Sequence, residues 1–309
     1  MIQSLRNIKL RMKSVENTEK ITRAMEMVSA SKLNRMKNIL YTARPYFSKV
    51  EVLMRNVLKS ADMPDHPLLK KRSEARSIAI FVVTSDAGLC GVYNHNMIRL
   101  TEEFVARKGK DAVELIAIGR EAFNYFKRAG YRISEGYGDL HSRYSVEVAS
   151  EIAESLKRIF LDGKADEVYA AYTRFDSTLR HKPVVEKLLN IESSEMGGVE
   201  YIAEPDMASV LDELFSWYLH ERIRIIILNS FTSEHSARMI AMKMATDNAK
   251  DLMDSLTLSR NKARQAMITK EVIEIASSAE ALKGPGSRYS FSRGRGSADI
   301  ECDKDRGSR

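Results

Sequence analysis

The sequence predicts an α/β protein in which a long N-terminal helix and a long C-terminal helix pack as an antiparallel coiled coil beside a central parallel α/β domain. Apolar residues recur at alternating steps of three and four over residues 5–57 and again over residues 207–267, as on one face of a helix. Between these stretches, short apolar runs alternate with helical patterns, which is typical of a parallel sheet. With 309 residues, 44% of them hydrophobic, the chain can bury a core of this kind.

The N-terminal helix, predicted for residues 1–60, carries a seam that is apolar at both ends and polar in the middle. Ile21, Met25 and Val28 lie beside its polar part, and Pro45 is a position where the helix could bend. The seam positions are Leu5, Ile8, Met12, Val15, Glu19, Thr22, Glu26, Ser29, Leu33, Met36, Leu40, Ala43, Phe47, Val50, Met54 and Val57.

The C-terminal helix, predicted for residues 206–282, carries a matching seam. Because a seven-residue apolar repeat implies a left-handed supercoil, we pair the two helices with each other. The seam positions are Met207, Leu211, Leu214, Tyr218, Glu221, Ile225, Leu228, Thr232, His235, Met239, Met242, Thr246, Ala249, Met253, Leu256, Arg260, Ala263 and Met267.

The central domain, predicted for residues 75–192, alternates strands with helices. The predicted strands are "RSIAIFVVTSD", "VELIAIG" and "DEVYAAYTRF", and the predicted helices cover residues 94–107, 120–129 and 146–161. Residues 283–309 are poor in apolar residues and rich in Gly, Ser and Arg, so we expect a disordered tail.

Composition limits the class of protein. The net charge of +7 suggests either an acidic partner or simply a solvated surface, and both readings stay open. Cys90 and Cys302 are far apart in sequence, which argues against a disulfide framework and for a reducing compartment. No apolar run approaches the roughly 20 residues that span a bilayer, and no signal-peptide core is present.

Motifs for catalysis and cofactor binding are mostly missing. The string G-x-x-x-x-G-K-[ST], which cradles nucleotide phosphates, does not occur, and the six histidines and two cysteines lack the usual metal-ligand spacing. The turn "SDAGLCG" after the first central strand places Cys90 where a nucleophile could sit, although a structural thiol is the commoner case. We therefore predict no catalytic residue, no metal and no cofactor.

Three segments carry a family resemblance: "IKLRMKSVENTEKITRAMEMVSASKL", "TSDAGLCGVYNHN" and "SEHSARMIAMKMATDNAKDLMDSLTLSRNKARQAMITKEVIEIASSAEAL". In that order, and joined by "DHPLL", "KPVVEKLL" and "YIAEPD", they resemble the gamma subunit of rotary F-type ATP synthases over residues 1–282. The resemblance implies a non-catalytic rotor shaft that couples ion-driven rotation of a membrane c-ring to the catalytic sites of a ring of alpha and beta subunits. It also implies a Rossmann-like central domain that, with the epsilon and possibly the delta subunit, joins the shaft to the c-ring.

The resemblance further implies two groups of contact residues. Lys270 stands where the family commonly has glutamine, and Ala203 stands where some members have an aromatic residue. The implied contacts to the catch loops of the beta subunits are Met25, Arg238, Arg264, Gln265 and Thr269, and the implied contacts to the membrane ring are Tyr201 and Glu204. A peripheral position on the cytoplasmic face of a bacterial or archaeal inner membrane follows from the same resemblance, whereas the coupling ion, H⁺ or Na⁺, does not.

Two interpretations of the polar seam remain open. Polar residues would let contacts break and re-form as a shaft turns past several partners, because tightly packed interfaces do not slide smoothly. Alternatively, Met25 and Val28 simply pack on the C-terminal helix. Two other functions are also weighed: nucleic-acid binding through the "RGRG" tail, which we do not favour because the core lacks RNA-binding motifs, and a separate α/β enzyme that uses "SDAGLCG".

Overall fold

The structure is a computed structural model that describes residues 5–58, 77–138, 140, 145–189, 204 and 206–282. It divides into two compact units. The larger unit is Ser14–Leu252, and the smaller unit combines Met1–Lys13 with Met253–Arg309. Each unit is described by itself below. The tail predicted for residues 283–309 lies outside the described residues.

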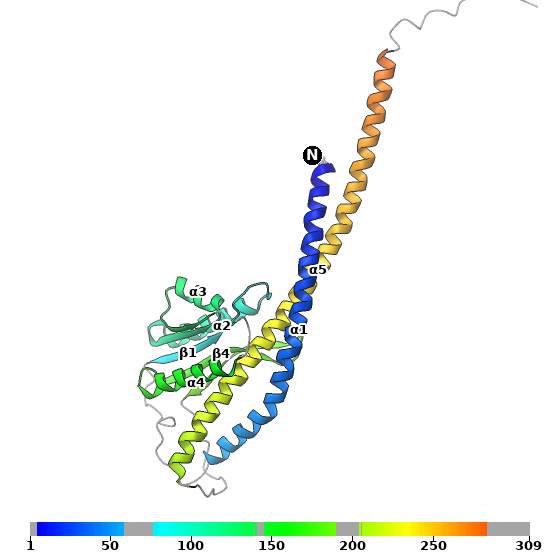
Figure 1. Ribbon diagram of the computed structural model, residues 1–309. Helices are drawn as coiled ribbons and strands as arrows, with labels where there is room; N and C mark the ends of the chain where they lie inside the picture. Colours follow the sequence, from blue (N-terminus) through cyan, green and yellow to red (C-terminus); the bar gives the residue numbers. More distant parts are fainter. Residues whose placement is uncertain are drawn as a thin grey trace, which may run out of the picture. The chain divides into compact units, whose positions relative to one another are not determined.

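The two long helices are α1, Leu5–Val57, and α5, Met207–Leu282. Within the larger unit they lie side by side and run antiparallel, as the sequence predicts (Figure 1). Residues nearer the start of α1 contact residues nearer the end of α5: the hydroxyls of Thr22 and Thr246 are 2.8 Å apart. Further along α1, the ring of Phe47 stacks on that of Tyr218, closer to the start of α5, with 6.1 Å between the centroids. Pro45 lies inside α1 and does not end it.

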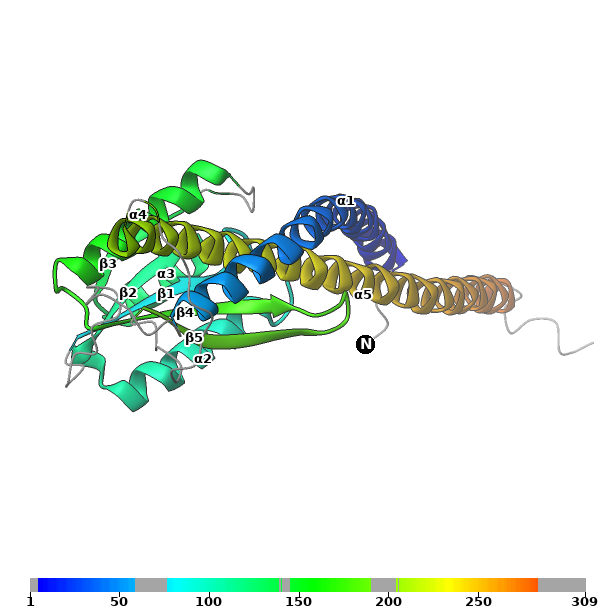
Figure 2. The ribbon, with the colours of Figure 1, turned by 90° about the horizontal axis from the view of Figure 1, so that it is seen from below.

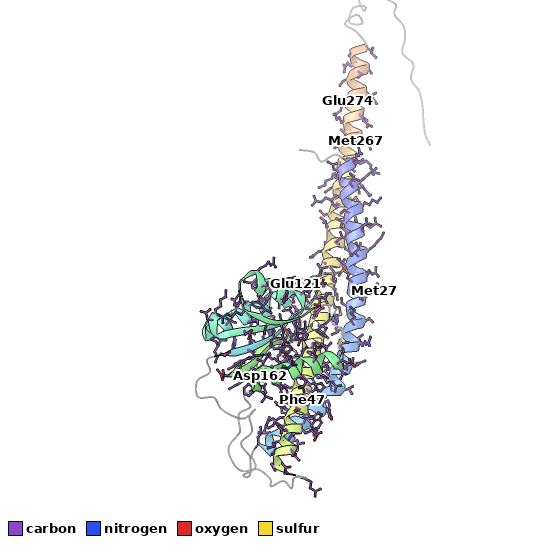
Figure 3. All side chains as sticks on the ribbon, turned by 60° about the vertical axis from the view of Figure 1, so that its left-hand side comes forward. Met27, Phe47, Glu121, Asp162, Met267 and Glu274 are labelled. Atoms are coloured by element: carbon purple, nitrogen blue, oxygen red, sulfur yellow. The ribbon has the colours of Figure 1, made fainter. Side chains whose placement is uncertain are left out.

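The seam of α1 packs best toward its C-terminal end. All of its positions over residues 33–57 are buried, and several belong to the main hydrophobic core. Figure 3 labels Phe47 in this part of α1, beside α5. The apolar spacing in the sequence therefore marks the real contact face.

The central sheet has five strands in the order β3-β2-β1-β4-β5. Four run parallel, and β5 runs antiparallel to β4 at one edge. The strands are β1 Ile78–Val83, β2 Val113–Ile118, β3 Ile133–Tyr137, β4 Glu167–Phe175 and β5 His181–Leu189. The helices between them are α2 Tyr93–Lys108, the short 3₁₀ helix η1 Lys110–Ala112, α3 Arg120–Arg128 and α4 Val146–Leu161.

The parallel α/β prediction is confirmed, but the sequence analysis did not find the two edge strands. β3 reads "ISEGY" and has no apolar run. β5 contains Pro183, which lowers any strand prediction yet is tolerated at a sheet edge because an edge strand leaves one row of N–H groups unpaired.

Helices cover both faces of the sheet, and Figure 2 shows α2 and α4 on opposite sides. β1 is buried along its whole length and alternates between two cores. Ala79, Phe81 and Val83 face the core that α4 shares with both long helices, whereas Ile80 and Val82 face the core under α2 and α3. Within the larger unit, α1 and α5 are thus a layer of the α/β domain as well as a coiled coil.

Candidate functional site

A polar segment of α5, residues 229–238 with the sequence "NSFTSEHSAR", meets the end of β4. The Asn229 side chain accepts a hydrogen bond from the Phe175 amide at 3.2 Å, and the Ser230 hydroxyl accepts one from the Thr173 amide at 3.3 Å. The Ser233 hydroxyl donates to the Thr173 carbonyl at 3.2 Å. β1 pairs with β4 only as far as Ala171. Beyond that point, these α5 side chains form hydrogen bonds with β4 backbone groups on the side where β1 no longer pairs.

Arg238 extends the attachment to the loop between β1 and α2, residues 84–92. Its Nη1 lies 2.7 Å from Oε1 of Glu234, one turn earlier in α5. Its Nη2 donates to the Ala87 carbonyl at 2.9 Å, and its Nε and Nη2 each lie 3.4 Å from the Gly88 carbonyl. One guanidinium therefore joins a carboxylate of α5 to the backbone of the loop.

The loop itself is held by a small polar network. The Asn94 side chain accepts a hydrogen bond from the Ser85 amide at 3.1 Å and donates to the Cys90 sulfur at 3.3 Å. Burial raises the pKa of the Cys90 thiol, so at neutral pH this group is a protonated structural thiol and a poor nucleophile. Leu89 is exposed and has a φ of 61°, a left-handed conformation that is uncommon for leucine.

A cavity of about 310 Å³ lies beside this loop, at the edge of the sheet where the parallel strands end. Open α/β sheets usually bind ligands at this edge. Here α1 and α5 supply part of the lining of the cavity. The lining residues are Ala24, Met25, Val28, Ser29, Lys32, Asp86, Ala87, Arg120, Glu234, His235 and Arg238.

The polar positions of the α1 seam stay on the buried face of the helix. Thr22 and Ser29 are buried, and Thr22 meets Thr246 of α5 hydroxyl to hydroxyl. Ile21 and Val28 are 60% and 57% exposed, so the apolar residues beside the seam do not replace it. Met25 is half-buried and Val28 is mostly exposed, and both line the cavity together with Glu234, His235 and Arg238 of α5, so the interpretation that they pack on the C-terminal helix stays open.

The last part of α5, in the smaller unit, carries three of the residues expected to contact beta subunits. Arg264, Gln265 and Thr269 are all exposed, and the Thr269 hydroxyl donates to the Gln265 carbonyl of its own helix at 2.9 Å. Lys270 lies 3.5 Å from Glu274, so its charge faces a carboxylate on the same helix. Met25 and Arg238 belong to the larger unit.

Residues 264–282 of α5 are exposed without exception. Figure 3 labels Met267 and Glu274 on this part of the helix. The large apolar side chains exposed on it are Met267, Ile268, Val272, Ile273, Ile275 and Leu282. Such a concentration of exposed apolar residues is typical of a surface that a partner covers.

The other expected contacts, Tyr201 and Glu204, precede α5 in the sequence. Tyr201 lies outside the described residues, whereas Glu204 is described and exposed. Asp206 accepts hydrogen bonds from the amide and the hydroxyl of Ser209 at 2.9 and 2.8 Å, which lower its pKa and cap the helix. The sequence analysis missed this cap, although an aspartate directly before a helical apolar pattern is a recognisable N-cap signal.

The described part of the chain contains neither a candidate metal site nor a candidate membrane-spanning helix. No three of its His, Cys, Asp and Glu side chains are grouped so that they could hold a metal ion. None of its helices is both long and apolar enough to cross a membrane.

Comparison with known proteins places the chain in a family. The family model described as ATP synthase matches residues 4–282. The ATP synthase gamma chain of Pelotomaculum thermopropionicum is 42% identical over 285 residues, which cover 91% of this chain and 99% of that protein. The gamma chain of Chlorobium phaeobacteroides is 39% identical over 289 residues, with the same two coverages.

Solved structures share the fold. A chain of the Euglena gracilis mitochondrial ATP synthase, in a structure described as OSCP, F1 and c-ring, has a TM-score of 0.68 at 15% identity and covers 94% of this chain and 98% of its own. A chain of the Tetrahymena thermophila central stalk and c-ring has a TM-score of 0.57 at 22% identity, covering 73% and 99%.

Two antiparallel helices that also form one layer of an α/β domain are thus the fold that this chain shares with the solved ATP synthase structures. The chain belongs to the ATP synthase gamma chain family. Its function is that of the central-stalk rotor of the F-type enzyme, and the resemblance seen in the sequence is confirmed.

Proposed function

We propose that this chain is a non-catalytic rotor shaft, which transmits rotation of a membrane c-ring to the catalytic sites of a ring of alpha and beta subunits. The observation that carries the proposal is the fully exposed, apolar-rich segment 264–282 of α5, which needs a partner to cover it. The family relationship makes the alpha and beta ring the natural partner. Burial raises the pKa of the Cys90 thiol, which argues against catalysis through this one group.

The proposed organisation follows the sequence segments: shaft helices over residues 1–60 and 206–282, a connecting α/β domain over residues 75–192, and a tail over residues 283–309. We propose that the epsilon subunit, with delta as a further candidate, binds at the α/β domain. We place the protein at the cytoplasmic face of a bacterial or archaeal inner membrane, attached through the complex and without nucleic acid as a partner.

The proposed contacts to the beta subunits are Met25, Arg238, Arg264, Gln265 and Thr269. Exposed guanidinium, amide and hydroxyl groups on α5 can grip carboxylates and backbone groups by hydrogen bonds of about 1.5–3 kcal/mol when charged, strong enough to transmit force yet breakable. The proposed contacts to the membrane ring are Tyr201 and Glu204, of which Glu204 is exposed.

The test is purification of the tagged full-length chain from its own cells. We expect a complex with three copies each of two P-loop subunits, and no ATP hydrolysis by the isolated chain. Recovery of the chain without those subunits, or hydrolysis by the pure chain that a single substitution abolishes, would contradict the proposal.

The contact residues are tested in the assembled complex. Replacing Arg264 and Gln265 together by Ala should reduce ATP-driven rotation while the subunits stay assembled, because only surface contacts are lost. Lys262→Ala is the matched control, since Lys262 is also exposed on α5 and is not among the proposed contacts. Normal rotation in the double variant would remove these two residues from the contact set.

A further inference from the structure

We propose that Arg238 is a positioning residue of the rotor, which together with Glu234 fixes the β1–α2 loop to α5 so that the α/β domain and the helix turn as one body. This inference rests on the proposed rotor function. It gives Arg238 a task inside its own chain, in addition to any contact with a beta subunit.

The contacts of Arg238 are those of a fixed link. The side chain of Glu234 is 1% exposed and that of Arg238 is 11% exposed, so this ion pair is shielded from water. A buried carboxylate is unfavourable without its cation, which keeps the guanidinium in place. The planar guanidinium then reaches the carbonyls of Ala87 and Gly88, whereas the single ammonium of a lysine could not serve three acceptors in this geometry.

The loop attachment has a mechanical consequence. The polar segment of α5 already holds the end of β4 through Thr173 and Phe175. The main core, which contains Ala79 and Phe81 of β1 as well as Phe231 of α5, also holds the sheet to the long helices. The Arg238 link adds a polar attachment between α5 and the loop that follows β1, so the loop moves with the helix.

The loop conformation agrees with an externally held segment. Leu89 keeps a positive φ, which costs free energy and persists only where surrounding contacts impose it. A Cβ atom added at Gly91 would lie 3.8 Å from the Cβ of Ala241 on α5, so the loop approaches the helix closely. The Tyr93 hydroxyl also donates to the Ser230 carbonyl at 3.2 Å.

The first experiment measures amide hydrogen exchange in the isolated full-length chain. In Arg238→Met, amides of residues 86–92 should exchange at least about tenfold faster than in the wild type, because the loop loses its link to α5. Arg224→Met is the matched control: Arg224 also pairs with a buried glutamate of α5, Glu221, and should leave loop exchange unchanged. Unchanged loop exchange in Arg238→Met would overturn the inference.

The second experiment replaces the link by a covalent one in the assembled complex. The Cβ distance of 3.8 Å suits a disulfide between Gly91→Cys and Ala241→Cys, built with Cys90→Ser and Cys302→Ser. Gly91 has a φ of 59°, so a cysteine at this position strains the backbone. A control chain therefore carries the two new cysteines and the two serine replacements but keeps Arg238. The readout is the number of ions pumped per ATP hydrolysed.

With Arg238→Met added, we expect this ratio to fall severalfold in the reduced complex and to recover on oxidation. A ratio that stays low after the disulfide has closed and loop exchange has slowed would show that Arg238 acts by touching a neighbouring subunit, and would overturn the inference. Failure of the chain to assemble with alpha and beta subunits would instead refute the rotor function. The hydrogen-exchange experiment on the isolated chain would still test the Arg238 link.

Discussion

Two parts of α5 differ completely in their surroundings. Residues 225–237 are buried without exception, whereas residues 264–282 are exposed without exception. Both contain apolar side chains, among them Phe231 in the first part and Ile273 in the second. One helix thus changes from an internal element of the α/β domain to a surface that the other described residues leave uncovered.

The difference teaches where the chain carries its own stability and where it depends on partners. In the buried part, polar side chains bond to the backbone of the sheet, and removing one partner leaves another group unsatisfied. In the exposed part, truncation of a side chain costs the isolated chain little. The two parts should therefore respond oppositely when stability and assembly are measured side by side.

The largest effect is expected from Phe231→Ala, because Phe231 is 2% exposed within the main core. Loss of a buried phenyl ring should lower the free energy of unfolding by about 3–5 kcal/mol. The matched variant Ile273→Ala should change it by less than about 0.5 kcal/mol. Urea unfolding of the isolated chain measures both.

The same two variants are also compared for their assembly with alpha and beta subunits. Ile273→Ala should weaken it if partners cover the exposed part of α5. Equal unfolding free energies for Phe231→Ala and Ile273→Ala would refute the distinction between the two parts.

The second effect isolates the polar contacts. Asn229→Leu keeps the approximate volume but leaves the Phe175 amide without its acceptor and removes the 2.9 Å contact to Arg44. Each buried group left unsatisfied costs about 1–3 kcal/mol. Asn248→Leu, on an exposed position of α5, is the control and should be nearly neutral. The outcome is read from thermal unfolding, and a neutral Asn229→Leu would mean that water replaces the lost acceptor.

The sequence predicted the two long helices, their seams and the central parallel strands, because each has a strong periodic pattern. It did not predict β5, where Pro183 weakens the pattern and pairing with β4 supplies the stability. It also missed the roles of Asn229, Ser230 and Ser233. These side chains bond to a strand more than fifty residues away in sequence, and local periodicity carries no information about such partners.

The family resemblance named Arg238 but not its surroundings. Only the folded chain brings its guanidinium to the Ala87 and Gly88 carbonyls, 151 and 150 residues away. The resemblance likewise gave Gln265 and Thr269, which the structure leaves exposed and whose contacts to other subunits stay predictions. Motifs identify residues well, but their partners depend on tertiary structure and assembly.

A smaller effect is expected at the polar seam between α1 and α5. Replacing Thr22 and Thr246 together by Val removes both hydroxyls at once, so no buried group loses its only partner, and stability should stay within about 1 kcal/mol of the wild type. If the polar seam serves the turning shaft, the assembled double variant should rotate more slowly although the chain is no less stable. Unfolding of the isolated chain and rotation of the complex, measured on the same preparation, separate the two effects. Wild-type rotation would leave the seam a purely structural contact.

The smallest effect concerns pH and returns to the edge strand that the sequence did not predict. His181 begins β5, and burial lowers its pKa below the usual value. Its Nδ1 is buried and has no hydrogen-bond partner among the described residues, so a proton there would add a buried N–H without an acceptor. The native state therefore favours the neutral ring, while the unfolded chain takes up a proton near its ordinary pKa of about 6.5. The stability that this difference supplies is present above about pH 6.5 and is lost as the pH falls below it.

His181→Gln should make the unfolding free energy less sensitive to pH between 7 and 5, and His95→Gln, at an exposed position of α2, should leave the wild-type profile unchanged. Identical pH profiles for the wild type and His181→Gln would show that His181 does not contribute to the acid sensitivity of this edge of the sheet.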